Sequence, residues 1–386
     1  MVLHKTSNHK DILSIRPSYL DRGKNKFKKF NAKISGKHAF LNNNEVNNIL
    51  SLKSVLKALP YVPDAIVLHW VSGFINATLI SQLSHKLKVP IFWYFMDFSP
   101  LTGGCHALWG CDKYQENCRP CPALINYKNP FLAQKQLLFK VKYLRHLPIT
   151  LLLGTTGLIK MAKLSPIFSL HRTVHLPLGI DSNKLRPLEQ KSCNKDIPKD
   201  KIKLCFAAKD IFEERKGLQL LLDCFDELPP EIATKIHLIL VGDNSHKFKS
   251  NSLSFSIRPF QTDLVALNEV LNSADFLICP SKDDAGPMII NIAIMSGLAI
   301  VAFNDGVAPD IVFPGLNGYL AQPDSKRELI EILKKITRLE YNQILKMKKR
   351  SRQIGLDKLS LDNQLTTFIA SYNHIKDDYQ KNPELN

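Results

Sequence analysis

Two lysines in the C-terminal half have the charge and positions needed to hold a diphosphate, and an aspartate lies where it can meet a polar ligand. Lys209 follows the apolar run KIKLCFAA, and Lys216 stands directly before Gly217 and a new apolar segment. Two cations at the carboxyl end of a buried strand can neutralise a diphosphate. Asp284 lies in the polar loop after another apolar run, SADFLIC, where it can meet a polar ligand. Lysines in loops are commonly only solvated, so the interpretation depends on a second anion site nearby.

The segment PSKDDAGPMIINIAIMSG, which contains Asp284, supplies that second site. Pro287 is expected at the first position of a helix that ends before Gly297. The free N–H groups near Gly286 and the positive end of the helix dipole suit a phosphate. Ile292, eight residues after Asp284, offers no hydrogen bond to a ligand.

In the N-terminal half, an acidic side chain and an imidazole follow two apolar runs. Asp97 comes after PIFWYF, with a Gly103-Gly104 turn shortly beyond it, and His69 stands near the end of DAIVLHW. A carboxylate and free backbone N–H groups at a strand end can bind a hydroxyl-rich or anionic ligand. Structural alternatives are equally open, since Asp97 can cap the turn and His69 can be a satisfied buried histidine.

Four cysteines stand close together in SPLTGGCHALWGCDKYQENCRPCPAL. Cys105, Cys111, Cys118 and Cys121 form a C-x5-C-x6-C-x2-C pattern, and four such thiols can form a tetrahedral structural zinc site. His106 can replace one ligand or be a polar loop residue. The spacing also allows disulfides, which a reducing compartment disfavours, so zinc and reduced or conditionally oxidised thiols are the alternatives.

Short apolar runs alternate with helical segments, which predicts an α/β fold with parallel sheets covered on both faces. Strands are expected in DAIVLHW, PIFWYF, LPITLLLGT, RTVHLPLG, KIKLCFAA, KIHLILVGD, ADFLICPS and LAIVAFN. Helices are expected over 76–87, 218–228, 263–273 and 326–336. Two Rossmann-like lobes follow, with the ligand in a cleft between them.

A polar stretch containing proline, near Asn183 to Lys199, separates the two halves. The expected division is an N-terminal lobe over 1–182, a C-terminal lobe over 183–355 and a terminal helix over 356–386. That helix either packs back across the lobes or caps the second lobe. With 386 residues and 45% hydrophobic content, the chain can build two ordinary cores.

The chain carries 52 Lys and Arg against 35 Asp and Glu, and a net charge of +17 favours an anionic partner. The densest basic run, RGKNKFKKFNAKISGK, fits a membrane-surface patch or a solvated loop. No window approaches 18 consecutive apolar residues, and MVLHKTSNHKD lacks the apolar run of a secretory signal. We expect a cytoplasmic protein, peripheral to the inner face of the cytoplasmic membrane. The chain shows no RNP, zinc-finger or homeodomain pattern, so no nucleic acid partner is expected.

The motifs between Asp64 and Asp324 resemble, in order, those of the family 4 retaining glycosyltransferases. They are similar to the branch that builds bacterial exopolysaccharide, capsule and lipopolysaccharide. The motifs are LHWVSGF, MDFSPLTGGCHALWGC with CRPCPAL, PLGIDSNKLRP, the Lys-Gly pair after a strand, ADFLICPSKDDAGP, IMSGLAIVAFNDGVAPDIV and NGYL. The resemblance implies a GT-B architecture, with a nucleotide-sugar in the C-terminal lobe and a saccharide or lipid-linked acceptor in the N-terminal lobe. It also implies transfer with retention, without a metal or other cofactor in catalysis.

Donor-binding positions of the family correspond to residues of this chain. Its basic residues for the diphosphate correspond to Lys209 and Lys216, and its E-x7-E pair corresponds to Asp284 and Ile292. Asp284 can accept hydrogen bonds from sugar hydroxyls, whereas Ile292 cannot bind the ribose as the second Glu would. A hydrogen bond to a charged group is worth roughly 1.5 to 3 kcal/mol, so roughly 10- to 100-fold weaker donor binding is expected.

Two further departures concern the N-terminal lobe. Many members have His-Asp where this chain has Met96-Asp97, which leaves the sugar contact to Asp97 or His69. The chain begins at what resembles the second strand of the lobe, so a first strand, a glycine-rich loop and a helix, roughly 30 residues, are expected to be missing. Ile292 and this shortening favour an alternative, a degenerate non-catalytic GT-B protein that acts as a binding or scaffold subunit. A GT-B sugar-nucleotide epimerase is a third option, against which the cysteine cluster counts.

Overall fold

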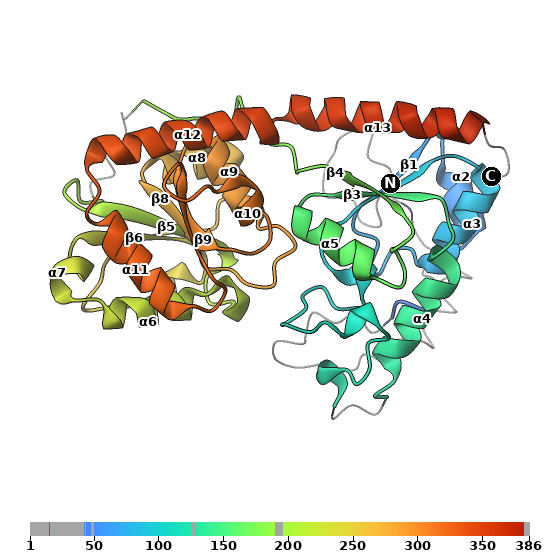
Figure 1. The fold of residues 1–386 in the computed structure, drawn as a ribbon, viewed down its shortest axis with the longest axis horizontal. Helices are drawn as coiled ribbons and strands as arrows, with labels where there is room; N and C mark the ends of the chain where they lie inside the picture. The colour runs from blue at the N-terminus through green and yellow to red at the C-terminus, as the bar shows by residue number, and fades with distance from the viewer. Residues whose placement is uncertain are drawn as a thin grey trace. The chain divides into compact units, whose positions relative to one another are not determined.

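The computed structural model describes residues 15, 42, 44–47, 50–125, 129–189 and 196–381, drawn as a ribbon in Figure 1. Its chain divides into two compact units. Unit 1 comprises Met1–Leu153, Leu158–His175 and Ile369–Asn386, and unit 2 comprises Gly154–Gly157 and Leu176–Phe368. The basic run RGKNKFKKFNAKISGK and the start of the chain lie outside the described residues.

A parallel four-stranded sheet in the order β1-β2-β3-β4 forms the centre of unit 1. Its strands are β1 (Ile66–Leu68), β2 (Ile91–Tyr94), β3 (Ile149–Leu153) and β4 (Arg172–His175). The residues of β2 and β3 are all buried, which explains why both segments read as continuous apolar runs. The helices of this part of the chain are α2 (Leu52–Ala58), α3 (Ala77–Leu87), α4 (Leu132–Leu144) and α5 (Thr156–Leu164).

A long loop connects β2 to α4 and contains all four clustered cysteines. In its described residues, the only regular structure is three single-turn 3-10 helices, η2 (Ser99–Leu101), η3 (Lys113–Gln115) and η4 (Pro122–Leu124). Loops of this length with so little secondary structure are uncommon in compact domains and usually carry function. We call this segment, residues 95–131, the cysteine loop.

Unit 2 is built on a parallel six-stranded sheet in the order β10-β9-β8-β5-β6-β7. The strands are β5 (Ile202–Asp210), β6 (Ile236–Asp243), β7 (Ser254–Arg258), β8 (Phe276–Cys279), β9 (Ala299–Phe303) and β10 (Gly318–Ala321). The two edge strands, β7 and β10, were not among the predicted strands. β7 alternates serine with larger side chains, and β10 (GYLA) contains glycine and alanine, so neither forms the run of large apolar side chains that marks a central strand.

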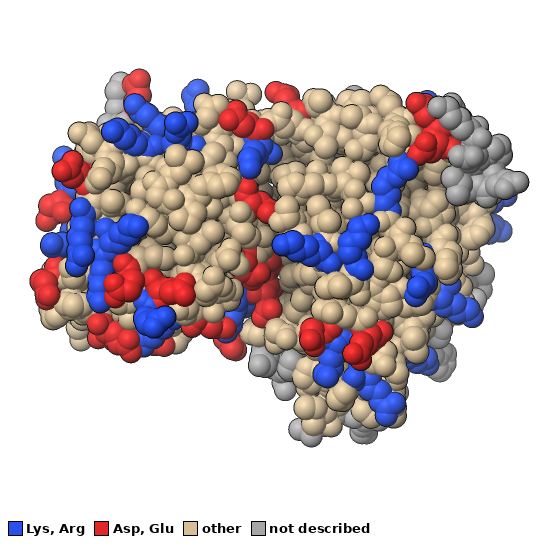
Figure 2. All heavy atoms as spheres, viewed as in Figure 1, with Lys and Arg blue, Asp and Glu red and all other residues tan. Residues whose placement is uncertain are grey.

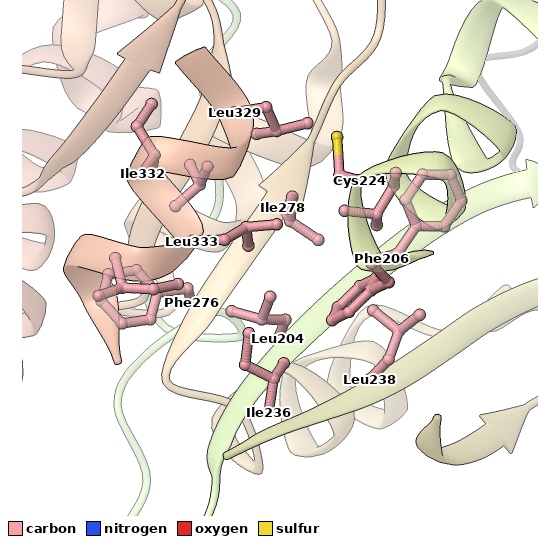
Figure 3. Close-up of a cluster of buried hydrophobic side chains, with 14 of the residues drawn as sticks. Leu204, Phe206, Cys224, Ile236, Leu238, Phe276, Ile278, Leu329, Ile332 and Leu333 are labelled. Carbon is pink, nitrogen blue, oxygen red and sulfur yellow. The ribbon is translucent and has the colours of Figure 1, made fainter. Parts of the chain in front are cut away.

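Helices cover both faces of this sheet (Figure 1). On one face, side chains of α6 (Leu218–Glu227) and α11 (Lys326–Ile336) pack on the strands. Figure 3 shows Leu329 and Leu333 of α11 against Phe276 and Ile278 of β8. The second core lies under α8 (Leu264–Asn272), α9 (Met288–Met295) and α12 (Tyr341–Leu359). The remaining short helices are η5 (Glu214–Lys216), α7 (Pro230–Ala233), η6 (Ser245–Lys247) and α10 (Ala308–Ile311).

A final helix, α13 (Leu361–Lys381), follows α12 after Ser360. Its first residues belong to unit 2, and from Ile369 onward they belong to unit 1. In unit 1, the Tyr372 ring lies 6.4 Å from the Phe92 ring, between centroids, and the Tyr379 hydroxyl donates to the Pro148 carbonyl at 3.3 Å. Among the described residues, no helix has the length and apolar content needed to cross a membrane.

Candidate active site

A cavity of about 590 Å³ opens in unit 2 at the carboxyl ends of its central strands. Residues from the ends of β5, β6 and β8 line one side, and residues at the start of α9 line another. In open parallel sheets, ligands bind beyond the carboxyl ends of the strands. The cavity therefore lies where the sheet topology places a ligand site.

The predicted cations lie on this cavity. Lys209, at the end of β5, is exposed there, and Lys216 on η5 is joined by a neighbour that sequence reasoning missed, Arg215. Arg215 can be recognised as one of two consecutive basic residues before Gly217, but only the tight 3-10 turn makes both face the cavity. Gly217 has a φ of 79°, and a Cβ there would lie 2.2 Å from the Pro280 carbonyl oxygen, so this close approach requires glycine.

Asp284 pairs with both cations of the turn. Its Oδ2 lies 2.8 Å from Lys216 Nζ and 3.0 Å from Arg215 NH1, and Arg215 also contacts Glu213 at 2.8 Å. Burial alone would raise the pKa of Asp284, but Lys216 and Arg215 outweigh it and hold the pKa below its usual value. Asp284 is therefore an ionised carboxylate, and together with Glu213 it neutralises the two cations.

The helix after this loop begins one residue later than predicted. Pro287 is the residue before α9, with ψ at 104°, so the first helical residue is Met288 and not Pro287. Pro287 nevertheless lines the cavity. The Gly286 N–H, predicted to meet a phosphate, donates to Asp284 Oδ1 at 3.3 Å. The helix does end before Gly297, whose φ is 80°.

Ile292 is part of the cavity wall and is 4% exposed. Its neighbour Asn291 is equally buried but is not among the lining residues, which agrees with their separation of about 100° around a helix. The cavity wall is therefore apolar at Ile292, the position that the resemblance assigns to a second Glu.

In unit 1, Asp97 makes the predicted cap and a further contact. Its Oδ1 accepts from the Ser99 N–H at 2.9 Å and from the Ser99 hydroxyl at 2.7 Å. Its Oδ2 lies 2.5 Å from Nδ1 of His106. The His106 ring lies 5.4 Å from the ring of Trp70, which is 64% exposed. The contact of His106 with Asp97 and that of Trp70 with His106 were not predicted, because they depend on how the cysteine loop and the end of β1 fold.

His69 lies just beyond the end of β1 and its side chain is exposed, so the alternative of a satisfied buried histidine is wrong. Its ring packs on Tyr94 with centroids 5.8 Å apart, and the resulting partial burial lowers the pKa of His69. Carboxylate, imidazole and aromatic side chains therefore lie near the carboxyl ends of β1 and β2. They belong to Asp97, His69, His106 and Trp70.

The four cysteines of the loop are free thiols. Cys118 and Cys121 are buried, whereas Cys105 and Cys111 are partly buried. Burial raises the pKa of Cys105, and the thiols of Cys121, Cys118 and Cys111 raise it further. In the described part of the chain, no three Cys, His, Asp or Glu side chains are positioned to hold a metal ion as they stand.

Comparison with solved structures shows the fold class of the chain. Sucrose-phosphate synthase from Thermosynechococcus elongatus aligns with a TM-score of 0.63 at 14% identity, over 84% of this chain and 78% of that one. A glycosyltransferase from Rickettsia africae gives 0.60 at 14% identity, over 93% and 88%. HepE from Anabaena, in complex with UDP and glucose, gives 0.54 at 14% identity, over 83% and 79%. The predicted α/β fold of the GT-B type is confirmed.

In the C-terminal half, residues 189–354 match the family described as Glycosyl transferases group 1. WcaC of Escherichia coli K12, named as a proposed colanic acid biosynthesis glycosyl transferase, is 24% identical over 246 residues, 59% of this chain and 55% of its own length. A 41.2 kDa protein in the cps region of Klebsiella pneumoniae is 22% identical over 184 residues, 47% and 49% of the two chains. The chain spans about half the length of these curated relatives.

Proposed function

We propose that this protein is a retaining glycosyltransferase that moves a sugar from a nucleotide-sugar donor to a growing surface polysaccharide or a lipid-linked acceptor. The observation that carries the proposal is the unit 2 cavity, where Lys209, Arg215 and Lys216 face a space at the carboxyl ends of the strands. The names of the relatives from colanic acid and cps regions support a polysaccharide product. The UDP complexes of HepE, which shares the fold, support a nucleotide-sugar donor.

The donor's diphosphate would meet the cations that Asp284 now neutralises. Lys216 and Arg215 already lie within hydrogen-bond distance of a carboxylate oxygen, so they are oriented for an anionic oxygen. When phosphate oxygens replace the carboxylate, Asp284 is released to accept hydrogen bonds from hydroxyls of the donor sugar. The same cations stabilise the nucleoside diphosphate as it leaves.

Transfer breaks the bond between the anomeric carbon and the diphosphate and forms a bond from that carbon to an acceptor oxygen on the same face of the sugar. The proton of the acceptor hydroxyl passes to the departing diphosphate. We assign acceptor binding to the group in unit 1. The Asp97 carboxylate and the imidazoles can hydrogen-bond to hydroxyls, and the exposed Trp70 ring offers the flat apolar surface on which sugar rings commonly pack.

We also propose that the protein works in the cytoplasm, at the inner face of the membrane. The net charge of +17 favours anionic headgroups. In Figure 2, Lys and Arg side chains on the face in view form several separate groups interspersed with acidic residues, so electrostatic attraction on this face is spread over the surface.

Calorimetric titration with nucleoside diphosphates tests the donor site. Wild-type protein should bind at least one of UDP, GDP, ADP and CDP, and Lys216→Ala should weaken that binding about 10- to 100-fold, because it removes a charged hydrogen bond. The exposed Lys247, which does not line the cavity, provides the control, since Lys247→Ala should leave the affinity unchanged. Absence of binding by the wild-type protein to all four nucleotides would refute the donor site.

A non-catalytic GT-B protein that serves as a binding or scaffold subunit is the second candidate. Ile292 favours it, because an apolar side chain lines the cavity where the resemblance expects a ribose-binding Glu. Ile292→Glu should tighten donor binding about 10- to 100-fold if the ribose of the donor binds beside residue 292. Ile292→Gln is the matched control and should gain less, since its amide carries no charge. An unchanged affinity in Ile292→Glu would support the non-catalytic candidate.

A further inference from the structure

A buried ion pair joins helix α4 to the turn that contains Glu45, within unit 1. Lys140 Nζ lies 2.8 Å from Glu45 Oε2, and the two side chains are 5% and 9% exposed. We propose that this pair positions Asp97 and His106, the carboxylate and the imidazole assigned above to acceptor binding. The proposal rests on that part of the proposed function and is independent of donor binding in unit 2.

Lys140 holds both ends of the single-turn helix η2. Its Nζ donates to the carbonyl of Ser99, the first residue of η2, at 2.7 Å, and to the carbonyl of Thr102, the residue after η2, at 3.1 Å. With the bond to Glu45, all three N–H groups of the ammonium are used. Asp97 lies two residues before η2, so the anchor restrains the backbone that carries Asp97.

Two hydroxyl groups connect the same ion pair to the Asp97 side chain. The Ser72 hydroxyl donates toward Glu45 Oε1 at 3.1 Å and toward Ser99 Oγ at 3.2 Å, so its one proton is shared between them. The Ser99 hydroxyl donates to Asp97 Oδ1 at 2.7 Å. Because a carboxylate only accepts hydrogen bonds, Nδ1 of His106, 2.5 Å from Asp97 Oδ2, carries a proton. The His106 ring is therefore oriented by Asp97, and Asp97 is oriented by Ser99.

Stability alone does not account for two charges in this position. Lys and Glu are almost never fully buried unless paired, because removing both charges from water costs free energy that their attraction often only offsets. An apolar pair of similar volume commonly holds two elements together as well or better. An apolar pair lacks directed hydrogen bonds, and here those bonds end on the residues that surround Asp97.

Replacing both charges together tests positioning separately from stability. Lys140→Met alone leaves Glu45 as a buried charge without its partner, so the double variant Lys140→Met/Glu45→Met should have the higher melting temperature of the two. The KM for the p-nitrophenyl hexoside that the wild-type protein uses best as acceptor should nevertheless be raised about 5- to 10-fold in both, because both lose the directed hydrogen bonds. The affinity of unit 2 for a nucleoside diphosphate should be unchanged.

A milder variant and a matched control complete the set. Ser72→Ala removes only the hydroxyl between Glu45 and Ser99, and it should raise the acceptor KM about 3-fold with little effect on folding. His171→Ala removes a buried hydrogen bond, 3.1 Å between His171 Nε2 and the Leu144 carbonyl, at the C-terminal end of α4. It should lower the melting temperature and leave the acceptor KM unchanged.

Amide hydrogen exchange of residues 97–102, followed by mass spectrometry, needs no substrate. This segment should exchange faster in the double variant than in the wild type, and His171→Ala should exchange there as the wild type does. Faster exchange in the double variant, combined with no sugar transfer by the wild-type protein, would refute the proposed function and support the positioning.

Three results would overturn the proposal. The first is unchanged exchange of residues 97–102 in the double variant. The second is an acceptor KM that returns to the wild-type value in the double variant together with the melting temperature. The third is a KM in His171→Ala raised as much as in the double variant. If the double variant does not fold, unchanged exchange and an unchanged KM in Ser72→Ala overturn the proposal.

Discussion

At the scale of the residue, Asp284 is a substitute anion for the ligand that the cavity is proposed to take. Its carboxylate engages Lys216 and Arg215, and all three charged groups are largely shielded from water. A carboxylate in this position competes with a diphosphate for the same two cations. The same carboxylate becomes useful once the donor is bound, because it can then accept hydrogen bonds from sugar hydroxyls.

Asp284→Asn separates these two roles. We expect it to tighten the binding of a bare nucleoside diphosphate by up to about 5-fold, since removing a competing ion pair is worth up to roughly 1 kcal/mol. It should also slow sugar transfer, because the amide is a weaker acceptor for hydroxyls. Calorimetry and product formation measure the two effects. Asp324→Asn, at an exposed ion pair with Lys282, should change neither. Weaker diphosphate binding in Asp284→Asn would contradict the competition.

At the scale of the element, local signals explain which parts could be predicted from the sequence. The side chains of Asn76 and Asp263 accept the N–H of Leu79 and Ala266, so α3 and α8 begin where the sequence indicated. Lys209, Lys216 and Asp284 were predicted to lie near the carboxyl ends of strands, and the structure places all three near the carboxyl ends of strands of one sheet. Positions that depend on turn geometry or on contacts across a loop were not predictable in this way, and Arg215 and His106 are the two that matter for the site.

The pairing of β6 with β7 contains a histidine whose ionisation is coupled to folding. His237 is 1% exposed, and its two ring nitrogens lie 2.9 and 3.0 Å from the hydroxyls of Ser254 and Ser256. Burial lowers the pKa of His237, nearby Lys201 lowers it further, and Asp196 opposes the shift. The folded protein therefore holds this ring neutral at a pH where the unfolded chain protonates it.

Stability should respond to acid through this residue. Because the pKa of His237 is lower in the folded state, the unfolded chain takes up the proton first, and the free energy of unfolding falls as pH decreases below about 6.5. Urea unfolding followed by circular dichroism between pH 7.5 and 5.5 measures the slope. His237→Gln should reduce the slope by up to about 1.4 kcal/mol per pH unit. The exposed His246 is the control, and a slope in His237→Gln equal to that in His246→Gln would contradict the account.

At the scale of the whole molecule, repeated strand and helix units made the fold class predictable, since a parallel strand that is buried on both faces has a continuous apolar sequence. The edge strands β7 and β10 do not follow that rule, because β7 alternates serine with larger side chains and β10 (GYLA) contains glycine and alanine. The two units are not two consecutive segments of the sequence, because residues from Ile369 onward belong again to unit 1. Contacts such as that of Tyr372 with Phe92, far apart in the sequence, leave no local signal.

The measurement that tests the central claim most directly is release of nucleoside diphosphate from a panel of nucleotide-sugars, with and without saccharide acceptors. We predict release from at least one donor by the wild-type protein and by Lys247→Ala. Lys216→Ala should lose at least about 90% of that rate at the same donor concentration, because weaker diphosphate binding lowers both donor occupancy and stabilisation of the leaving group. Equal release by Lys216→Ala and wild type, or no release from any donor by the wild-type protein, would contradict a glycosyltransferase site in this cavity.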